Sequence, residues 1–417
     1  MKVKFIHLSG LASLVLFLPA AGETIYSGLI DTPIPTDFDG VTLTIGSGSF
    51  NPFFGGVGFA NNVDFQPGRL VATNIGTLQN FAVGATIDAN LVLGNNFGGS
   101  QDHVGTTFTA GTEGYIGFKN GSNYGWMRVI FTNNTGGALI KDWAYDNGVD
   151  AAINVGRVAM SAAVANAQTL TFSPGVSEAF TYGSAIADNG LDITSVSKTG
   201  AGTTTLNGSY SYTGATTVSD GRLNVNGTTN AASTFTVAAA KTLGGDGTIN
   251  GNVTLNGVLR PGQGGSTDRT LNLGGTLTAN TGSSMEFTIA AENNHDQLIV
   301  GSVDLANTDL SIGSFTDSTV TELVAGDGLN FLTNGSSFYK LINGTTTNMF
   351  ANATGLSAGE LTYFGLSGPQ FRYSEGGQTF WVAQPIGGST YLVAIPEPSI
   401  GLLGSLSLLG LALRRRR

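Results

Sequence analysis

The sequence contains no cysteine, and charged residues make up only 11% of its 417 positions. Without cysteine there is no disulfide framework, no thiol nucleophile and no cysteine-ligated zinc or iron–sulfur site. An average globular domain has roughly 25% charged residues, so the chain cannot build a charged helical surface. Disorder is disfavoured too, because apolar residues reach 41% and disorder combines low hydrophobicity with high net charge.

Basic residues are especially scarce. The formal net charge is −10, and removing residues 1–22 and 396–417 leaves 12 basic against 27 acidic residues, a net of −15. Phosphate binding needs clustered Lys and Arg, so no nucleic-acid partner is expected. The sequence also shows no cofactor motif.

Glycine, threonine and asparagine dominate instead, with 62, 50 and 33 residues, or 145 of 417 positions. Thr, Val, Leu, Ile and Phe interleaved with Asn and Gly predict many short strands joined by tight turns. The expected fold class is therefore all-β.

Residues 1–22 have the three parts of a secretory signal peptide. A basic start at Lys2 and Lys4 precedes an apolar run over 11–18, and small residues end the segment near Gly22. This predicts export and processing by signal peptidase. The stretch is too short to favour a membrane anchor.

The other end, residues 396–417, begins with Pro396, Glu397 and Pro398. An uncharged apolar run over 399–413 follows, and the chain closes on Arg414, Arg415, Arg416 and Arg417. Fifteen helical residues extend about 22 Å, less than the ~30 Å hydrocarbon core. The terminal arginines act as a cytoplasmic stop, so we expect a weak, transient transmembrane helix on an exported protein. A permanent tail anchor is the alternative.

This tail resembles the PEP-CTERM sorting signal, which combines a Pro-Glu-Pro motif, a short hydrophobic helix and a terminal basic cluster. The resemblance implies that exosortase, a membrane transpeptidase-like protein of Gram-negative bacteria that make exopolysaccharide, cuts the chain near Pro396–Pro398. The precursor would be anchored in the inner membrane, and the mature form would reach the cell surface or extracellular matrix.

Residues 23–157 form a first block in which seven or more short strands predict a β-sandwich or jelly roll. Tyr115–Phe118 and Tyr124–Val129 form a predicted hairpin, and this block resembles the N-terminal ectodomain of many PEP-CTERM proteins. Tyr124, Trp126 and Trp143 are candidate glycan contacts, and the polar partners would be Asp142 and Asp146. The favoured interpretation is that these aromatic rings belong to the core.

Residues 158–324 change to small-residue repeats. Residues 197–227, which read KTGAGTTTLNGSYSYTGATTVSDGRLNVNG over 198–227, resemble the autotransporter-associated β-strand repeat. The resemblance implies a right-handed parallel β-helix. The periodicity favours stacked coils as well, although an antiparallel sandwich could show the same alternation.

The inward face of these coils is predicted from paired apolar residues two positions apart. Leu255 and Leu273 should point inward, and Asn256 and Asn272 outward. The full set of predicted inward residues is Leu223, Val225, Phe235, Val237, Val253, Leu255, Leu271, Leu273, Met285, Phe287, Ile289, Leu298 and Val300.

Residues 325–395 loosely resemble the terminal coils of autotransporter passengers, followed by a linker. No twelve-strand membrane barrel is expected after them, because too few residues remain. The chain is therefore predicted to depend on a separate sorting machine for export to the surface.

Catalytic chemistry is poorly represented. His103 beside Asp102 has no assignable nucleophile, and His295 with Asp296 is interpreted as a corner entering a strand. Asp304 and Asp309 could flank a sugar bond, but any two of the 27 acids will fall close together somewhere. The glycine-rich segment 244–249 lacks the aspartate of a calcium-binding nonapeptide, so no metal site is predicted.

The resulting hypothesis is a non-enzymatic surface or matrix protein that is a substrate of exosortase and associates with exopolysaccharide, biofilm or adhesion. Two alternatives are a surface carbohydrate-active enzyme, such as a β-helix lyase or hydrolase, and a glycan-binding module.

Overall fold

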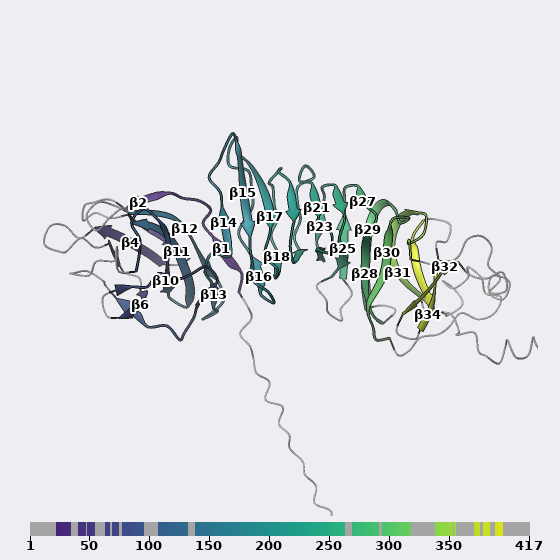
Figure 1. Ribbon diagram of the computed structural model, residues 1–417, viewed down its shortest axis with the longest axis horizontal. Coiled ribbons are helices and arrows are strands. Elements are labelled where there is room, and N and C mark those ends of the chain that lie inside the picture. The colour runs from purple at the N-terminus through teal and green to yellow at the C-terminus, as the bar shows by residue number, and fades with distance from the viewer. Residues whose placement is uncertain are drawn as a thin grey trace, which may run out of the picture. The chain divides into compact units, whose positions relative to one another are not determined.

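The computed structural model describes residues 22–34, 41–46, 48–54, 63–66, 69–74, 77–95, 107–131, 138–262, 269–291, 294–317, 338–352, 354–355, 371–375, 378–383 and 388–394. Within these ranges the protein is all-β and has no helix. The chain forms two compact units (Figure 1). Unit 1 comprises residues 1–23 and 32–155, and unit 2 comprises residues 24–31 and 156–417.

Every strand pairing described within unit 1 is antiparallel. Its strands are β2 (Thr32–Ile34), β3 (Leu43–Ile45), β4 (Gly48–Phe54), β5 (Val63–Gln66), β6 (Arg69–Asn74), β7 (Thr77–Leu78), β8 (Thr86–Ile87), β9 (Leu93–Asn95), β10 (Glu113–Asn120), β11 (Asn123–Phe131), β12 (Ala138–Asp146) and β13 (Ile153–Asn154). The longest strands, β10, β11 and β12, form a continuous meander.

The predicted hairpin is the β10–β11 pair. Asn120 pairs with Asn123, so two residues form the turn, and Gly121 adopts a φ of 59° that a residue with a side chain rarely takes. Both faces of this region are covered. Ile116 and Phe118 on one face are fully buried, and Trp126 on the other is 1% exposed.

Unit 2 is built mainly from parallel strands. They are β1 (Thr24–Tyr26), β14 (Val158–Met160), β15 (Ala167–Phe172), β16 (Ala179–Tyr182), β17 (Ile193–Lys198), β18 (Thr203–Leu206), β19 (Thr216–Val218), β20 (Arg222–Val225), β21 (Phe235–Val237), β22 (Thr242–Gly245), β23 (Thr248–Ile249), β24 (Val253–Leu255), β25 (Val258–Pro261), β26 (Arg269–Leu273), β27 (Leu277–Ala279), β28 (Ser283–Ala291), β29 (Asn294–Asp304), β30 (Thr308–Phe315), β31 (Phe338–Thr347), β32 (Thr354–Gly355), β33 (Phe371–Glu375), β34 (Gln378–Ala383) and β35 (Thr390–Ala394).

These strands line up in three parallel sheets. The first runs β15–β17–β19–β21–β24–β27, the second β1–β16–β18–β20–β22–β25–β28–β30, and the third β23–β26–β29–β31. Successive strands along the chain join different sheets, so each circuit forms one coil that stacks on the previous one (Figure 1). This arrangement is compatible with a β-helix-like fold, and the antiparallel-sandwich alternative is wrong for this region.

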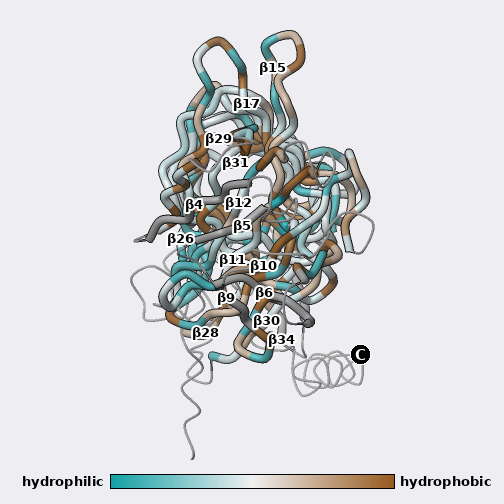
Figure 2. The backbone as a smooth tube through the Cα atoms, turned by 90° about the vertical axis from the view of Figure 1, so that its left-hand side faces the viewer, coloured by the Kyte–Doolittle hydropathy of each residue, from teal (hydrophilic) through white to brown (hydrophobic). Residues whose placement is uncertain are grey.

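The parallel register stacks like residues inside the coils. One inward row of the second sheet is fully buried or nearly so, and consists of Phe180, Thr204, Leu223, Leu243, Leu259, Met285 and Leu310. All thirteen residues predicted to point inward are 4% exposed or less. Hydrophobic and hydrophilic residues are interspersed along the chain rather than gathered in separate segments (Figure 2), as alternation along a strand requires.

Asparagines form ladders on the outside of the stack. The Asn280 side chain donates a hydrogen bond to Asn256 Oδ1 at 2.9 Å, and the Asn226 side chain donates to Asn207 Oδ1 at 3.1 Å. The predicted outward residues Asn256 and Asn272 are half-buried, consistent with their phase.

Antiparallel strands close both ends of the parallel stack. At the start, β14 pairs antiparallel with β15. At the other end β31 continues into the antiparallel series β35, β34, β33 and β32. The described strands between 325 and 395 are therefore largely antiparallel, because only β31 adds to the parallel coils. Paired ends leave fewer free strand edges for unwanted association.

Candidate functional site

Two of the three candidate glycan contacts lie in the interior of unit 1. Tyr124 is 2% exposed and Trp126 is 1% exposed. The Trp126 ring packs edge-on against Tyr115, with 5.5 Å between ring centroids. Neither ring can present a face to a sugar, so the stacking prediction is wrong for these two residues. Strand β11 is covered on both faces. The prediction assumed a strand that alternates between one buried face and one exposed face.

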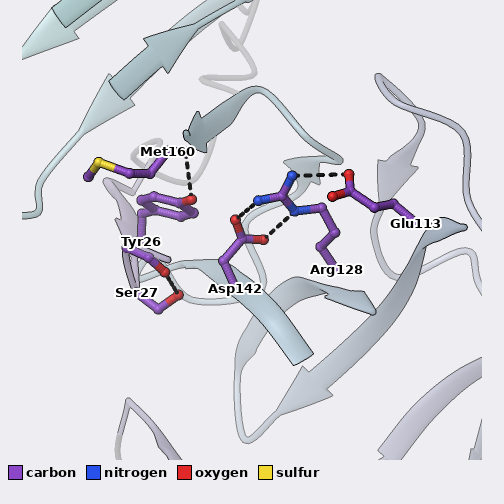
Figure 3. Close-up of polar contacts among 7 residues, drawn as sticks. Tyr26, Ser27, Glu113, Arg128, Asp142 and Met160 are labelled. Carbon is purple, nitrogen blue, oxygen red and sulfur yellow. Dashed lines mark hydrogen bonds and ion pairs between the residues drawn. The ribbon is translucent and has the colours of Figure 1, made fainter. Parts of the chain in front are cut away.

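The proposed polar partner Asp142 is fully buried in an ion pair (Figure 3). Arg128 Nε donates to Asp142 Oδ1 at 3.0 Å, and Arg128 Nη2 bonds the other carboxylate oxygen. Arg128 Nη1 also donates to Glu113 Oε2 at 3.1 Å. Burial lowers the pKa of Arg128, but the hydrogen bond and charge of Asp142, together with the charges of Glu113 and Tyr115, raise it by more. This bidentate pair stabilises the meander and is not a sugar contact.

Asp146 also has a structural role. It is 7% exposed, and its Oδ1 accepts the Gly148 amide at 2.8 Å. Burial raises the pKa of Asp146, and the Gly148 hydrogen bond opposes the shift. The carboxylate therefore stabilises the turn that follows β12.

Trp143 is placed differently from the other two aromatic candidates. It is half-buried on the face of β12 that also carries Lys141 and Tyr145, which are likewise half-buried. The Trp143 and Tyr145 rings lie 6.0 Å apart between centroids and are tilted by 30°. A glycan contact at Trp143 stays a prediction.

In unit 2, the described charged residues from 198 to 296 gather into clusters. The lysine cluster consists of Lys198, Asp220 and Lys241. Lys198 lies on an inward row between Phe172 and Val218 and is fully buried. Its ammonium donates to the carbonyls of Gly200 and Asp220, the latter at 3.0 Å.

The lysine cluster joins neighbouring coils. Lys241 Nζ pairs with Asp220 Oδ1 at 2.6 Å. Burial lowers the pKa of Lys198 to about 8, with the charge of Lys241 adding to the shift and Asp220 opposing it. The buried ammonium is satisfied by these turn carbonyls, so the cluster stabilises a corner of the stack.

The second cluster, the arginine corner, consists of Arg222, Arg260, Glu286 and Asp296. Arg260 Nε pairs with Glu286 Oε1 at 3.1 Å. Asp296 is 2% exposed, and its Oδ2 accepts the Thr288 amide at 2.9 Å. Burial raises the pKa of Asp296 to about 6, while Thr288 and the two arginines oppose the shift.

A carboxyl group with a pKa near 6 is chemically suited to general acid catalysis. Asp296 lies too deep for this, because a general acid must come within hydrogen-bond reach of a substrate. His295 lies at the start of β29, as predicted, with Nε2 3.2 Å from the Lys340 carbonyl and its ring edge-on to Tyr339. These groups support packing between coils.

Of the other acid candidates, one is engaged, one is exposed and one His–Asp pair lies outside the described ranges. Asp304 Oδ1 accepts hydrogen bonds from the Ala306 amide and the Asn348 side chain, and these bonds lower its pKa. Asp309 is exposed on β30. Asp102 and His103 are not among the described residues.

Metal binding finds no support in the described part of the chain. No group of three or more His, Asp or Glu side chains there could hold an ion. In the glycine-rich segment 244–249, the Asp246 carboxylate is paired with Arg269.

The sorting elements Pro396, Glu397, Pro398 and Arg414, Arg415, Arg416 and Arg417 lie outside the described residues, as do residues 1–21. Within the ranges that are described, no helix is long and apolar enough to cross a membrane.

Sequence reasoning missed both charged clusters because it treated the basic residues as sparse and scattered. A signal was present in their spacing. Asp220 follows Lys198 by 22 residues and Lys241 follows Asp220 by 21, which is about one coil. Charges spaced by one coil stack on each other in a parallel solenoid.

In a comparison with protein families, a model described as Passenger-associated-transport-repeat matches residues 196–225. This segment spans β17 to β20 and contains Lys198, Asp220 and Arg222. The repeat is typical of autotransporter passenger domains and indicates an exported surface protein. No curated protein matches the chain.

Proposed function

We propose that this protein is a non-enzymatic scaffold of the bacterial surface or extracellular matrix, built on a right-handed parallel β-helix that follows a β-sandwich unit along the chain. The observation that carries the proposal is the stack of three parallel sheets that includes the passenger-type repeat over 196–225. Such a stack presents repeated neutral side chains along its length and needs no reactive group.

The state of the acids supports a structural role. Asp142 is bound by Arg128, Glu286 by Arg260 and Asp246 by Arg269. Each of these carboxylates is held by an arginine of the protein itself, so it joins two parts of the chain. If the protein is not an enzyme, assays for new reducing ends and for unsaturated products on the host polysaccharide stay at background. Turnover that is abolished by mutating one acidic pair would establish the carbohydrate-active alternative.

The proposal includes a processing pathway. Signal peptidase removes residues 1–22, the apolar helix inserts transiently in the inner membrane, and exosortase cuts near Pro396–Pro398. Support comes from the sequence pattern of the tail. Intact-mass measurement of the surface-exposed protein in a host with exosortase should show loss of residues 399–417. Mature protein that keeps Arg414–Arg417 would contradict this pathway.

A second candidate function is glycan binding by unit 1, favoured by the half-buried Trp143–Tyr145 pair. Replacing Trp143 with Ala should then weaken binding of the full chain to host exopolysaccharide. Replacing Tyr115 with Ala should not, because its ring packs against Trp126 on the face of the sheet opposite to Trp143. Equal binding by both variants would remove this candidate.

A further inference from the structure

An outward-facing row on the second sheet of unit 2 carries polar residues on successive coils. In register, Asn224 pairs with Gly244 and Gly244 with Arg260. Leu259 pairs with Met285 on the next strand. The residue that follows Arg260 in the row is therefore Glu286, one position after Met285. Leu259 and Met285 are fully buried, so their chain neighbours Arg260 and Glu286 face outward.

Arg222 folds across this row. Its Nε donates to Asn224 Oδ1 at 2.6 Å, and its Nη2 donates to the Gly262 carbonyl at 2.7 Å. A Cβ on Gly244 would lie 2.7 Å from Arg222 Nη2. The absent side chain therefore leaves the space in which the Arg222 guanidinium lies, next to the rung of Arg260. Neighbouring rungs are about 4.8 Å apart.

The two guanidinium groups are poorly compensated. After burial, the charge of Arg260 is the largest influence that lowers the pKa of Arg222, to about 10, and Glu286 and Asp296 offset it only in part. Among the described residues, Arg260 has one ion pair, with Glu286, and its side chain is 28% exposed. Asp296 is held by the Thr288 amide and is 2% exposed.

The Glu286 pairing is easy to displace. It joins a partly exposed arginine and a glutamate that is 25% exposed, at 3.1 Å, and such pairs contribute little net stability. A carboxylate or sulfate can accept two parallel hydrogen bonds from a guanidinium, which one oxygen of Glu286 does not achieve. An external oxyanion would also relieve the repulsion between Arg222 and Arg260.

We propose that the arginine corner binds the carboxylate or sulfate groups of an acidic polysaccharide, with the anion lying between Arg222 and Arg260. The choice of a glycan as carrier of the anion rests on the proposed surface or matrix function. The net charge of −15 on the predicted mature chain does not prevent this, because charges beyond about 8 Å are largely screened at physiological salt. The binding is local to the corner.

The test is calorimetric titration of the full chain at physiological salt with three polymers. Oligogalacturonate carries carboxylates, dextran sulfate carries sulfates, and dextran is uncharged. We expect binding of at least one charged polymer and none of dextran, and the preferred polymer identifies the anion. Binding of dextran with equal affinity, or of none of the three, overturns the proposal.

Two variants have opposite expected effects. Arg260→Gln removes one guanidinium and should weaken binding about tenfold, the loss of a charge-assisted contact. Glu286→Gln removes the internal competitor and should strengthen binding severalfold. The matched controls are Lys119→Gln and Asp150→Asn, which make the same charge changes at an exposed ion pair in unit 1 and should leave affinity unchanged.

Weaker binding by Arg260→Gln and stronger binding by Glu286→Gln, with unchanged affinity of both controls, would support the arginine corner as the site. Equal effects at Glu286 and Asp150 would show that only net charge matters and would overturn it. If Arg260→Gln lowers the melting temperature, the Glu286→Gln result alone decides, and unchanged or weaker binding by that variant overturns the proposal. None of these outcomes depends on tail processing, which intact mass tests separately.

Discussion

The two units handle charge in opposite ways. Unit 1 buries a bidentate Arg128–Asp142 pair within an antiparallel meander. Unit 2 fills the inward rows of its parallel coils almost wholly with apolar residues, and its charges pair at corners or are capped by turn carbonyls. Each strand pairing of the meander occurs once, so the meander can accommodate one specific polar contact. In a parallel stack each residue lies over its register partner in the neighbouring coils, so an inward charge such as Lys198 lies between apolar partners, here Phe172 and Val218, and needs polar groups of the turns to stabilise it.

The largest loss of stability is expected when a charge is placed in an apolar row of unit 2. Leu255→Asp puts an unpaired carboxylate at a fully buried position and should cost about 5 kcal/mol of unfolding free energy. The neighbouring Asn256→Asp should cost much less, because that side chain is half-buried on the outside. Urea unfolding followed by far-ultraviolet circular dichroism measures both, and so does the pair Leu273→Asp and Asn272→Asp. Similar losses within either pair would show that the inward phase is wrong.

The next effect breaks the buried pair of unit 1. Asp142→Ala leaves the Arg128 charge without its bidentate partner and should cost about 3 to 5 kcal/mol. Asp150→Ala, which breaks the exposed pair with Lys119, should cost less than about 1 kcal/mol. Tryptophan fluorescence is a suitable probe, because Trp126 and Trp143 both lie in unit 1. A small loss for Asp142→Ala would mean that Glu113 or water compensates Arg128.

A smaller effect in unit 2 depends on pH. The pKa of Asp296 is raised to about 6 in the folded protein, above its usual value near 3.9. The folded state therefore holds this proton more tightly than the unfolded state, and its contribution to stability is present at low pH and is lost as pH rises through about 6. Between pH 5 and pH 7 the loss should be about 1 kcal/mol.

The matched comparison for this pH effect is Asp296→Asn, which cannot titrate. Urea unfolding at both pH values should show a smaller decrease for the variant than for the unmodified chain, since all other groups are shared. An equal decrease would show that burial does not hold Asp296 protonated.

The smallest effect concerns the external ladders. Asn280→Ala removes the hydrogen bond to Asn256 and should cost about 0.5 to 1 kcal/mol. Thermal unfolding detects it as a small decrease in melting temperature. A loss as large as that of Leu255→Asp would mean that the outer ladders, and not the apolar rows, stabilise the coils.

The sequence predicted unit 2 better than unit 1 for a physical reason. Residues such as Leu255 and Val253 alternate with polar neighbours, and a period of two identifies the buried face when one side of a strand meets solvent. Strand β11 violates that condition, because Tyr124, Trp126 and Arg128 are all buried along with their neighbours. The core interpretation favoured for Tyr124 and Trp126 agrees with their burial, whereas alternation gave no sign that Asp142 is buried in an ion pair.

Candidate sites were harder to predict than the fold. The Arg222 guanidinium lies in the space left by Gly244 on the next coil and donates to a carbonyl 40 residues away. Both contacts depend on the parallel register between coils. Alternation along one strand carries no information on which residues meet across strands. Only the spacing of Lys198, Asp220 and Lys241 offered such a signal.

Coil stacking also has a mechanical consequence. In unit 2 the strands of each coil pair with those of the adjacent coils, with Thr204 of one coil facing Leu223 of the next, 19 residues later, while a side chain such as Arg222 reaches one coil further. A force that pulls the ends of the stack apart would therefore peel one coil at a time, breaking a few bonds in sequence instead of a whole sheet at once. Each released coil would add about 60 Å of extended chain. We expect a protein that yields stepwise under load and absorbs work as an extensible tether, with the antiparallel strands at its ends limiting where peeling begins.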